Sequence, residues 1–143
     1  MSQAWNLVAD IGGTNARFSA ILDGELESEF QFLHSVDEYP EFENLIEILL
    51  EEINEATGWT SPPSRVCFAV ACPPDTETIS FTNSHWTFSQ TELKNLLDCD
   101  FLSIINDFEA VAHGITELSS DEFVQIGGGE AVHNKAIGIL GAG

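Results

Sequence analysis

The chain has 143 residues, a length that suits one domain with a buried core. Hydrophobic residues make up 43% of it and charged residues 20%, which indicates a globular rather than a disordered protein. Its 24 Asp and Glu against 4 Lys and Arg give a formal net charge of -20. It therefore lacks the clustered basic residues that bind nucleic-acid backbones or anionic membranes. A phosphate ligand would need backbone N–H groups and a metal ion to neutralise it.

The cysteines and the N-terminus indicate a reducing, cytoplasmic location. Cys67, Cys72 and Cys99 form neither a C-x-x-C motif nor an even-numbered disulfide framework. The N-terminal residues lack the basic flank and the apolar core of a signal peptide. No window approaches about 18 consecutive apolar residues, so we expect no membrane span.

The chain opens with three predicted strands. Apolar or alternating runs at 5–11, 16–22 and 27–33 are separated by glycine-containing turns at 12–13 and 23–24. Short turns join antiparallel neighbours, so we expect a three-strand antiparallel meander.

A helix is predicted next, over residues 42–56. Apolar residues recur there at the spacing of one helical face, and glutamates occupy the other face. Pro40 suits its first turn and Gly58 suits its end. The continuous apolar run at 65–71 then predicts a buried strand, parallel to the first strand.

The rest of the chain alternates between short strands and helices. Ser89 followed by Glu92 is a capping-box pattern, which predicts where the second helix begins. The remaining strands are predicted at 78–82, 101–105, 123–126 and 136–140, and the remaining helices at 89–97 and 108–115. Residues 1–143 are therefore predicted to form one α/β domain, a mixed sheet in which the meander is followed by parallel strands and helices cover the sheet.

A glycine turn directly after the first strand is the first candidate site, Asp10-Ile11-Gly12-Gly13-Thr14-Asn15. Glycines let backbone N–H groups approach a phosphate closely. Asp10, at the strand end, could hold Mg2+ directly or through water. An ordinary hairpin turn explains the same residues. The pattern is not a Walker loop, because no Gly-Lys-Ser/Thr follows.

A second candidate is Asn106-Asp107, after the strand predicted at 101–105. A carboxylate at the carboxyl end of a strand lies where α/β sheets bind ligands. Asp107 could accept a proton from a substrate hydroxyl. The competing interpretation is a helix N-cap, for which Asn and Asp are common.

A third candidate is the cluster Thr82-Asn83-Ser84-His85-Trp86. Its amide, hydroxyl, imidazole and indole groups suit hydrogen bonding and stacking with a sugar. A polar loop with a packed tryptophan explains it equally well.

Taken together, these segments resemble the N-terminal part of bacterial glucokinases. The resemblance is carried by four strings in the same order as in that family, LVADIGGTNARF, CPPDTETISFTNSHWTFS, IINDFEAVAHGI and AIGILGAG. It covers nearly the whole chain. It implies the ribonuclease H-like, actin-like ATPase fold that hexokinases, actin and heat-shock chaperone ATPases share. It also implies ATP-dependent phosphorylation of glucose to glucose 6-phosphate.

The resemblance implies a role for each matched segment. The turn from Asp10 to Thr14 would be the first phosphate loop, with Asp10 near the Mg2+ of ATP. Asp107 would be the catalytic base that takes the proton from the sugar 6-hydroxyl. Asn106 would hydrogen-bond a neighbouring hydroxyl, and Thr82 and Asn83 would border the sugar pocket. Positioning, a metal and a nearby base are what phosphoryl transfer requires.

The chain departs from the family in length. Members are considerably longer, and their second phosphate loop continues beyond the glycines at 141–143. Residues that bind adenine and the other sugar hydroxyls would follow in a C-terminal domain absent from this chain. We therefore expect this chain to lack turnover alone, because half of the positioning contacts are missing. The surface that would meet that domain favours a homodimer.

Three alternatives remain open. A kinase of another hexose would carry the same motifs, and a panel of sugars would distinguish it. A dinucleotide-binding protein could use AIGILGAG as the start of a Rossmann fingerprint, but this leaves the other motifs unexplained. A non-catalytic sugar-binding domain would keep the fold without turnover.

Overall fold

The fold consists of a mixed sheet, a short hairpin and helices. The computed structural model describes residues 4–23 and 25–141, except for the side chains of 25–29. Within these residues the strands are β1 (Trp5–Ile11), β2 (Asn15–Leu22), β3 (Glu25–Ser35), β4 (Arg65–Val70), β5 (Thr78–Ser80), β6 (Thr87–Ser89) and β7 (Phe101–Asn106). The helices are α1 (Phe42–Thr57), α2 (Gln90–Leu97) and α3 (Asp107–Ile115), with 3-10 turns η1 (Val36–Glu38) and η2 (Ser120–Glu122).

Contacts within the chain divide it into two compact units, residues 1–107 and residues 108–143. The assignment of residues 1–143 to one domain stays a prediction. Among the described residues, no helix is both long enough and apolar enough to cross a membrane. The predicted turn at 23–24 includes Gly24, and the predicted glycine loop includes residues 142–143. These three residues lie outside the described part of the chain.

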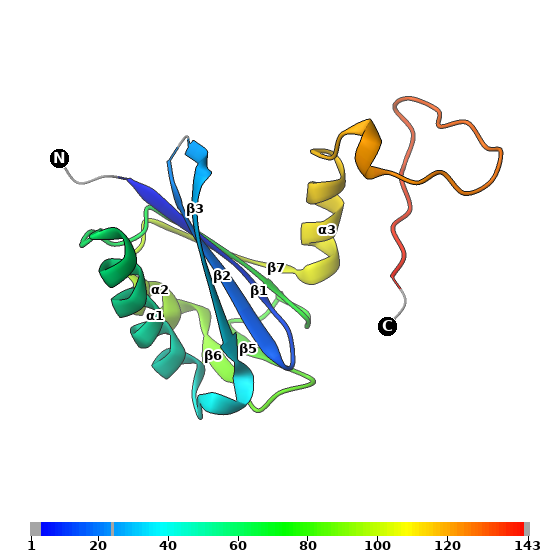
Figure 1. Cartoon of the computed structure of the whole chain (residues 1–143). Coiled ribbons are helices and arrows are strands. Elements are labelled where there is room, and N and C mark those ends of the chain that lie inside the picture. The colour runs from blue at the N-terminus through cyan, green and yellow to red at the C-terminus, as the bar shows by residue number, and fades with distance from the viewer. Residues whose placement is uncertain (1–3, 24, 142–143) are drawn as a thin grey trace. The chain divides into compact units, whose positions relative to one another are not determined.

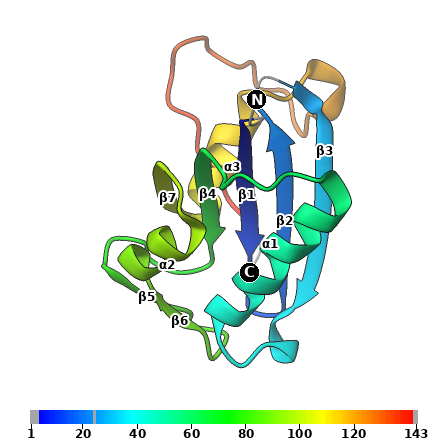
Figure 2. The ribbon, with the colours of Figure 1, turned by 90° about the vertical axis from the view of Figure 1, so that its left-hand side faces the viewer.

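In the described part of the first unit, the main sheet has five strands in the order β3-β2-β1-β4-β7 (Figures 1 and 2). β1 pairs antiparallel with β2, and β2 with β3. β4 pairs parallel with β1, and β7 with β4. The predicted meander and the parallel strands after it are therefore confirmed. The prediction missed β6, which pairs with β5 in a separate two-stranded ladder.

Helices α1 and α2 lie on the same face of the sheet (Figure 2). Alternation along β1 turns every second side chain toward that face. The buried residues of β1 are Trp5, Leu7, Ala9 and Ile11. Most of the apolar stripe that predicted α1 is buried in the structure: Phe42, Leu45, Ile46, Leu49 and Ile53. Leu50 is half-buried and Ala56 is exposed. The glutamates opposite it remain at the surface or partly exposed.

Two of the predicted helix boundaries are confirmed by their caps. Gly58 follows α1 in the left-handed conformation, with φ of 75°, and its N–H donates to the Asn54 carbonyl oxygen over 2.7 Å. A side chain there would be strained, so glycine suits this position. At the start of α2, the Ser89 hydroxyl oxygen accepts a hydrogen bond from the Glu92 N–H over 3.2 Å.

An aromatic cluster joins α1, the sheet and the β5–β6 hairpin. The Phe42 ring stacks on Phe88 at a centroid distance of 4.6 Å. It also lies 5.3 Å from Trp86 and meets Phe68 of β4 edge-on at 6.2 Å. Phe68 in turn meets Phe18 of β2 edge-on at 5.8 Å. Because aromatic side chains bury large areas, this cluster holds three separate segments against one face of the sheet.

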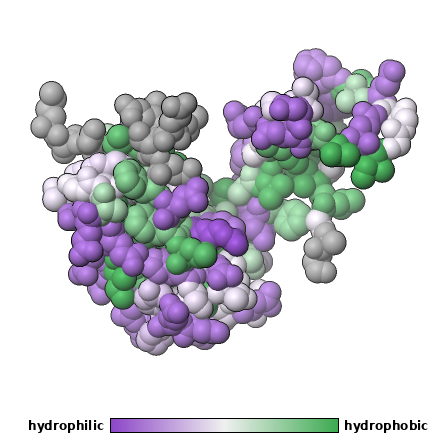
Figure 3. All heavy atoms as spheres, in the orientation of Figure 1, coloured by the Kyte–Doolittle hydropathy of each residue, from purple (hydrophilic) through white to green (hydrophobic). Residues whose placement is uncertain are grey.

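The strands predicted at 123–126 and 136–140 are not formed. Within the described residues, neither segment has a ladder partner. Their apolar side chains are largely exposed, including Ile126 at 95% and Leu140 at 99%. Figure 3 shows hydrophobic side chains, in green, at the molecular surface. An apolar run becomes a strand only when a neighbouring strand pairs with its backbone, and local pattern does not supply that neighbour.

Replacing Phe42 by Ala is expected to lower the free energy of unfolding by about 3–5 kcal/mol, because it leaves a cavity in the aromatic cluster. Urea unfolding followed by circular dichroism measures this loss. Ile48→Ala on the outer side of α1 is the matched control, since Ile48 is partly exposed. Its loss is expected to be about 1 kcal/mol or less. Equal losses would contradict the central position of Phe42.

Candidate functional site

The carboxyl ends of three parallel strands meet at one edge of the sheet. In the register, Ile11 of β1 lies beside Val70 of β4, and Val70 lies beside Asn106 of β7. The chain leaves this edge through Gly12, Ala71 and Asp107. The Ala71 N–H donates to the Ile11 carbonyl oxygen over 3.4 Å, which extends the pairing beyond β4. Ligands bind at this kind of edge in α/β sheets, so the glycine turn and Asn106-Asp107 share a site-forming edge.

The glycine turn closes the β1–β2 hairpin. The Gly12 N–H donates to the Asn15 carbonyl oxygen over 2.9 Å, so this amide is used by the turn itself. The Ile11 side chain is fully buried in the core, so it faces the helices and not a ligand. Thr14 and Asn15 are exposed. The hairpin interpretation is therefore confirmed, and the phosphate-loop interpretation stays a prediction.

The third candidate segment lies against the first. A Cβ built on Gly13 would lie 2.8 Å from the Asn83 carbonyl oxygen and 2.9 Å from the Asn83 Cβ. Only glycine permits this close approach. The same construction on Gly12 meets only the Asn15 carbonyl oxygen, at an ordinary 3.5 Å. The glycine turn and the exposed Asn83 therefore form one continuous surface.

The segment 82–86 is a closed loop with a buried anchor. The Phe81 N–H donates to the Trp86 carbonyl oxygen over 3.1 Å, and the Trp86 N–H donates to the Ser84 hydroxyl over 3.3 Å. Trp86 is only 1% exposed, whereas Thr82 and Asn83 are exposed. The sequence allowed two interpretations of this segment: a polar loop with a packed tryptophan, or a surface that binds a ligand. The observed geometry is compatible with both.

Asp10 projects from the sheet face opposite α1. Its carboxylate is 60% exposed and lies 3.4 Å from the Arg17 guanidinium, its cross-strand neighbour in β2. Ion pairs this exposed contribute little to stability. No cluster of three or more His, Cys, Asp or Glu that could hold a metal occurs among the described residues. A cation beside Asp10 would therefore take most of its ligands from water or from a substrate.

Asp107 is the first residue of α3 and is half-buried. Asn106, the last residue of β7, precedes the helix and is also half-buried. Burial raises the pKa of the Cys72 thiol, and the nearby negative charge of Asp107 raises that pKa further. Cys72 follows β4 and Asp107 follows β7, and the pairing of these two strands brings the chain after each of them to the same edge of the sheet.

Sequence reasoning gave no role to two residues around these segments. Arg17 was missed, although it is an isolated basic residue in a strongly acidic chain and follows the glycine turn. Tyr39 was also missed. Its backbone carbonyl oxygen accepts hydrogen bonds from His85 and Trp86, and no local pattern marks a backbone acceptor.

Comparison with known proteins identifies the family. A family model described as Glucokinase matches residues 7–143. The chain belongs to the glucokinase family. Its sequence is 40% identical over 142 residues to a glucokinase of Colwellia psychrerythraea, covering 99% of this chain and 42% of that protein. A glucokinase of Cronobacter sakazakii is 40% identical over 139 residues, covering 96% and 41%. The chain spans about two fifths of the length of these curated glucokinases.

Solved glucokinase structures share the fold. The crystal structure of a glucokinase from an Antarctic psychrotroph matches with a TM-score of 0.74 and 32% identity, over 91% of this chain and 40% of that chain. A Balamuthia mandrillaris glucokinase, solved with glucose, matches with a TM-score of 0.63 and 22% identity, over 84% and 34%. The predicted actin-like ATPase fold is confirmed. At 22% identity, the similarity to the Balamuthia mandrillaris protein shows a shared fold only.

Gly13→Ala is expected to lower the free energy of unfolding by about 1–3 kcal/mol, because the new Cβ forces the backbone of Asn83 to move. Gly12→Ala is the matched control, since its Cβ would lie at an ordinary van der Waals distance from the Asn15 carbonyl oxygen. Urea unfolding of both variants measures the difference. A loss at Gly12 as large as that at Gly13 would contradict the close packing of Gly13 on Asn83.

Asp107→Asn is expected to lower the pKa of Cys72, because removing a nearby negative charge favours the thiolate. The rate of Cys72 alkylation by iodoacetamide, followed by peptide mass spectrometry across pH, should rise at lower pH in this variant. Asp75→Asn is the control, since that exposed carboxylate is closer in sequence but is not among the charges that raise the Cys72 pKa. Identical profiles for wild type and Asp107→Asn would contradict the proximity of the two groups.

Proposed function

We propose that this chain carries part of the sugar and nucleotide site of an ATP-dependent glucokinase, which converts glucose to glucose 6-phosphate. The observation that carries the proposal is the shared edge of β1, β4 and β7. It brings a glycine turn, an exposed asparagine loop and a strand-end carboxylate into one unit of a chain that belongs to the glucokinase family.

Asp107 is the proposed base. As the 6-hydroxyl oxygen bonds to the γ-phosphorus, the bond from that phosphorus to the ADP oxygen breaks and Asp107 takes the hydroxyl proton. Asn106 and the exposed Thr82 and Asn83 would hydrogen-bond the other sugar hydroxyls. A half-buried carboxylate at the start of a helix suits this role, because it is accessible to a ligand yet held by the fold.

The glycine turn is the proposed phosphate loop. Because the Gly12 amide closes the turn, the proposed donors to phosphate are the Gly13 and Thr14 amides and the Thr14 hydroxyl. Arg17, whose guanidinium lies beside Asp10, adds positive charge at the same end of the hairpin. In a chain with a net charge of -20, these donors must act locally to attract a nucleotide.

The residues present fit a magnesium ion held mainly through ligands other than protein. Mg2+ in such sites keeps several waters and uses one or two carboxylates plus substrate phosphates. Asp10, exposed and at the strand end, supplies one carboxylate for that role. Bound Mg2+ would neutralise the phosphate charge that develops during transfer.

The curated glucokinases are more than twice as long as this chain. We propose that segments outside residues 1–143 complete the sugar and nucleotide contacts. Turnover by the chain alone is then expected to be very low, because catalysis of phosphoryl transfer depends on positioning both reactants. A cytoplasmic location and a homodimer stay predictions.

Glucose-dependent ADP release from Mg-ATP tests this function. It is measured for this chain and for a protein extended to the length of the curated relatives. Glucose-dependent release by the extended protein supports the proposal, and preference for mannose, fructose or an N-acetylhexosamine would instead indicate a kinase of another hexose. An extended protein that folds but shows no sugar-dependent release would contradict it.

In the extended protein, Asp107→Asn is expected to lower kcat by about 100-fold or more, with little change in sugar affinity, because it removes the base and keeps the shape of the side chain. Steady-state kinetics and glucose titration separate these two effects. Asp75→Asn, which neutralises an exposed carboxylate after β4, should leave both unchanged. An unchanged kcat in Asp107→Asn would exclude the proposed base.

A further inference from the structure

Three segments of the first unit contact one another in a closed ring. The glycine turn at 12–14 contacts the turn at 36–39 through the Val36 N–H, which donates to the Thr14 carbonyl oxygen over 2.9 Å. The turn at 36–39 contacts the loop at 82–86 through the Tyr39 carbonyl oxygen. The loop contacts the glycine turn where Asn83 packs on Gly13. The turn at 36–39 therefore links the two segments that carry the proposed ligand groups.

The Tyr39 carbonyl oxygen takes part in two hydrogen bonds of this link. His85 Nε2 lies 2.9 Å from it, and the Trp86 Nε1–H donates to it over 3.0 Å. Because a carbonyl oxygen only accepts, His85 must carry its proton on Nε2 in this contact. The two donors use both lone pairs of one oxygen. Neighbouring side chains of the loop are thus attached to a single backbone atom far away in the sequence.

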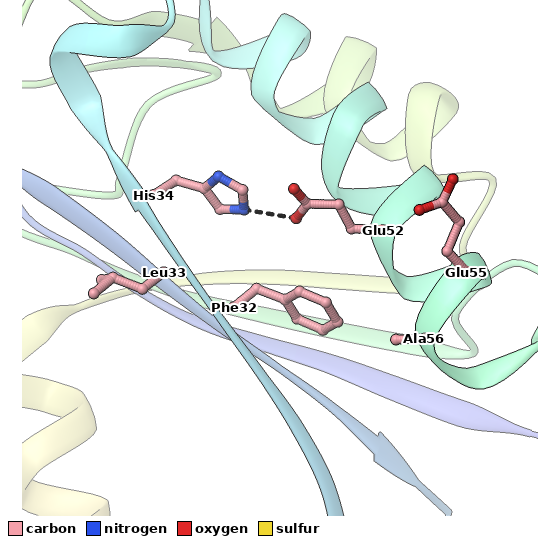
Figure 4. A pocket seen from close by; sticks show the side chains of 6 residues that line it. All are labelled: Phe32, Leu33, His34, Glu52, Glu55 and Ala56. Atoms are coloured by element: carbon pink, nitrogen blue, oxygen red, sulfur yellow. Dashed lines mark ion pairs between the residues drawn. The ribbon is translucent and has the colours of Figure 1, made fainter.

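The side chain of Tyr39 is also bound, through its hydroxyl. Its hydroxyl lies 2.9 Å from His34 Nδ1. His34 is only 8% exposed, and its Nε2 lies 3.0 Å from the Glu52 carboxylate on α1. Figure 4 shows His34 and Glu52 directed toward each other across a pocket between β3 and α1. Burial, followed by the charges of Glu52 and Glu38, raises the pKa of Tyr39.

We propose that His85 is a positioning residue, which holds the Thr82-Asn83 part of the loop against the glycine turn through its bond to the Tyr39 carbonyl. This inference rests on the proposed function, because it assigns Thr82 and Asn83 to the sugar side of the site. His85 is two residues from Asn83 and lies at the surface, whereas Trp86 is anchored in the core. Trp86 therefore fixes the end of the loop, and His85 restrains its exposed part.

The restraint matters because a loop that is already ordered loses less entropy when a ligand binds. With the Nε2–H committed to Tyr39, His85 acts on the sugar through Asn83 and not through that nitrogen. Loss of one such hydrogen bond is expected to weaken sugar binding about threefold to tenfold. The chemistry at Asp107 does not involve this bond, so kcat should change less than KM.

The first test measures the loop without any ligand. Hydrogen–deuterium exchange of this chain should be faster at residues 82–84 in His85→Ala than in wild type. His85→Gln keeps an N–H donor and should restore much of the protection. His133→Ala removes an exposed imidazole from the other unit and should leave these residues unchanged. Unchanged exchange in His85→Ala would overturn the positioning role.

The second test measures the sugar in the extended protein. His85→Ala should raise the glucose KM about threefold to tenfold with a smaller change in kcat, and His85→Gln should reverse most of the rise. Faster loop exchange without any change in KM would overturn the link between this loop and the sugar. Absence of glucose-dependent activity in the wild type would count against the proposed function, and the exchange result would still decide whether His85 positions the loop.

Discussion

The parallel register of β1, β4 and β7 is the constraint on which the candidate site depends. It aligns Ile11, Val70 and Asn106 at one edge of the sheet, so the chain leaves all three strands at the same edge. Segments that are far apart in the sequence thereby supply a glycine turn, a thiol and a carboxylate to one region. The register in turn depends on the apolar face that α1 and α2 cover, because a slip by one residue would expose every buried side chain of a strand.

A second constraint is the close approach of two backbones at Gly13 and Asn83. It leaves no space for a side chain at position 13, although the conformation of the turn does not itself require glycine there. Tyr39 supports the same loop from a second side, since its carbonyl oxygen accepts hydrogen bonds from His85 and Trp86. The polar groups of the loop are therefore supported from two sides by backbone atoms, which is how a surface loop can keep a defined geometry.

The charge of the chain shapes how such a site could bind a nucleotide. Acidic residues outnumber basic ones by 24 to 4, so the overall field repels phosphate. At the glycine turn the Arg17–Asp10 pair carries no net charge, so the proposed backbone N–H donors there would have to attract the phosphate. An acidic surface and a phosphate site are compatible when short-range donors decide binding.

The sequence by itself determined the local elements, because periodicity and caps are properties of neighbouring residues. It predicted β1, most of the buried stripe of α1, the end of α1 at Gly58 and the start of α2 at Ser89. It also predicted the candidate site segments, which the family resemblance connected. Tertiary structure decided which segments meet: the packing of Asn83 on Gly13 and the bonds to the Tyr39 carbonyl leave no periodic signal. It also decided that 123–126 and 136–140 are not strands, although their apolar runs predicted them. Hydrophobic pattern tells which face of a segment is buried, whereas pairing needs a partner that only the folded chain supplies.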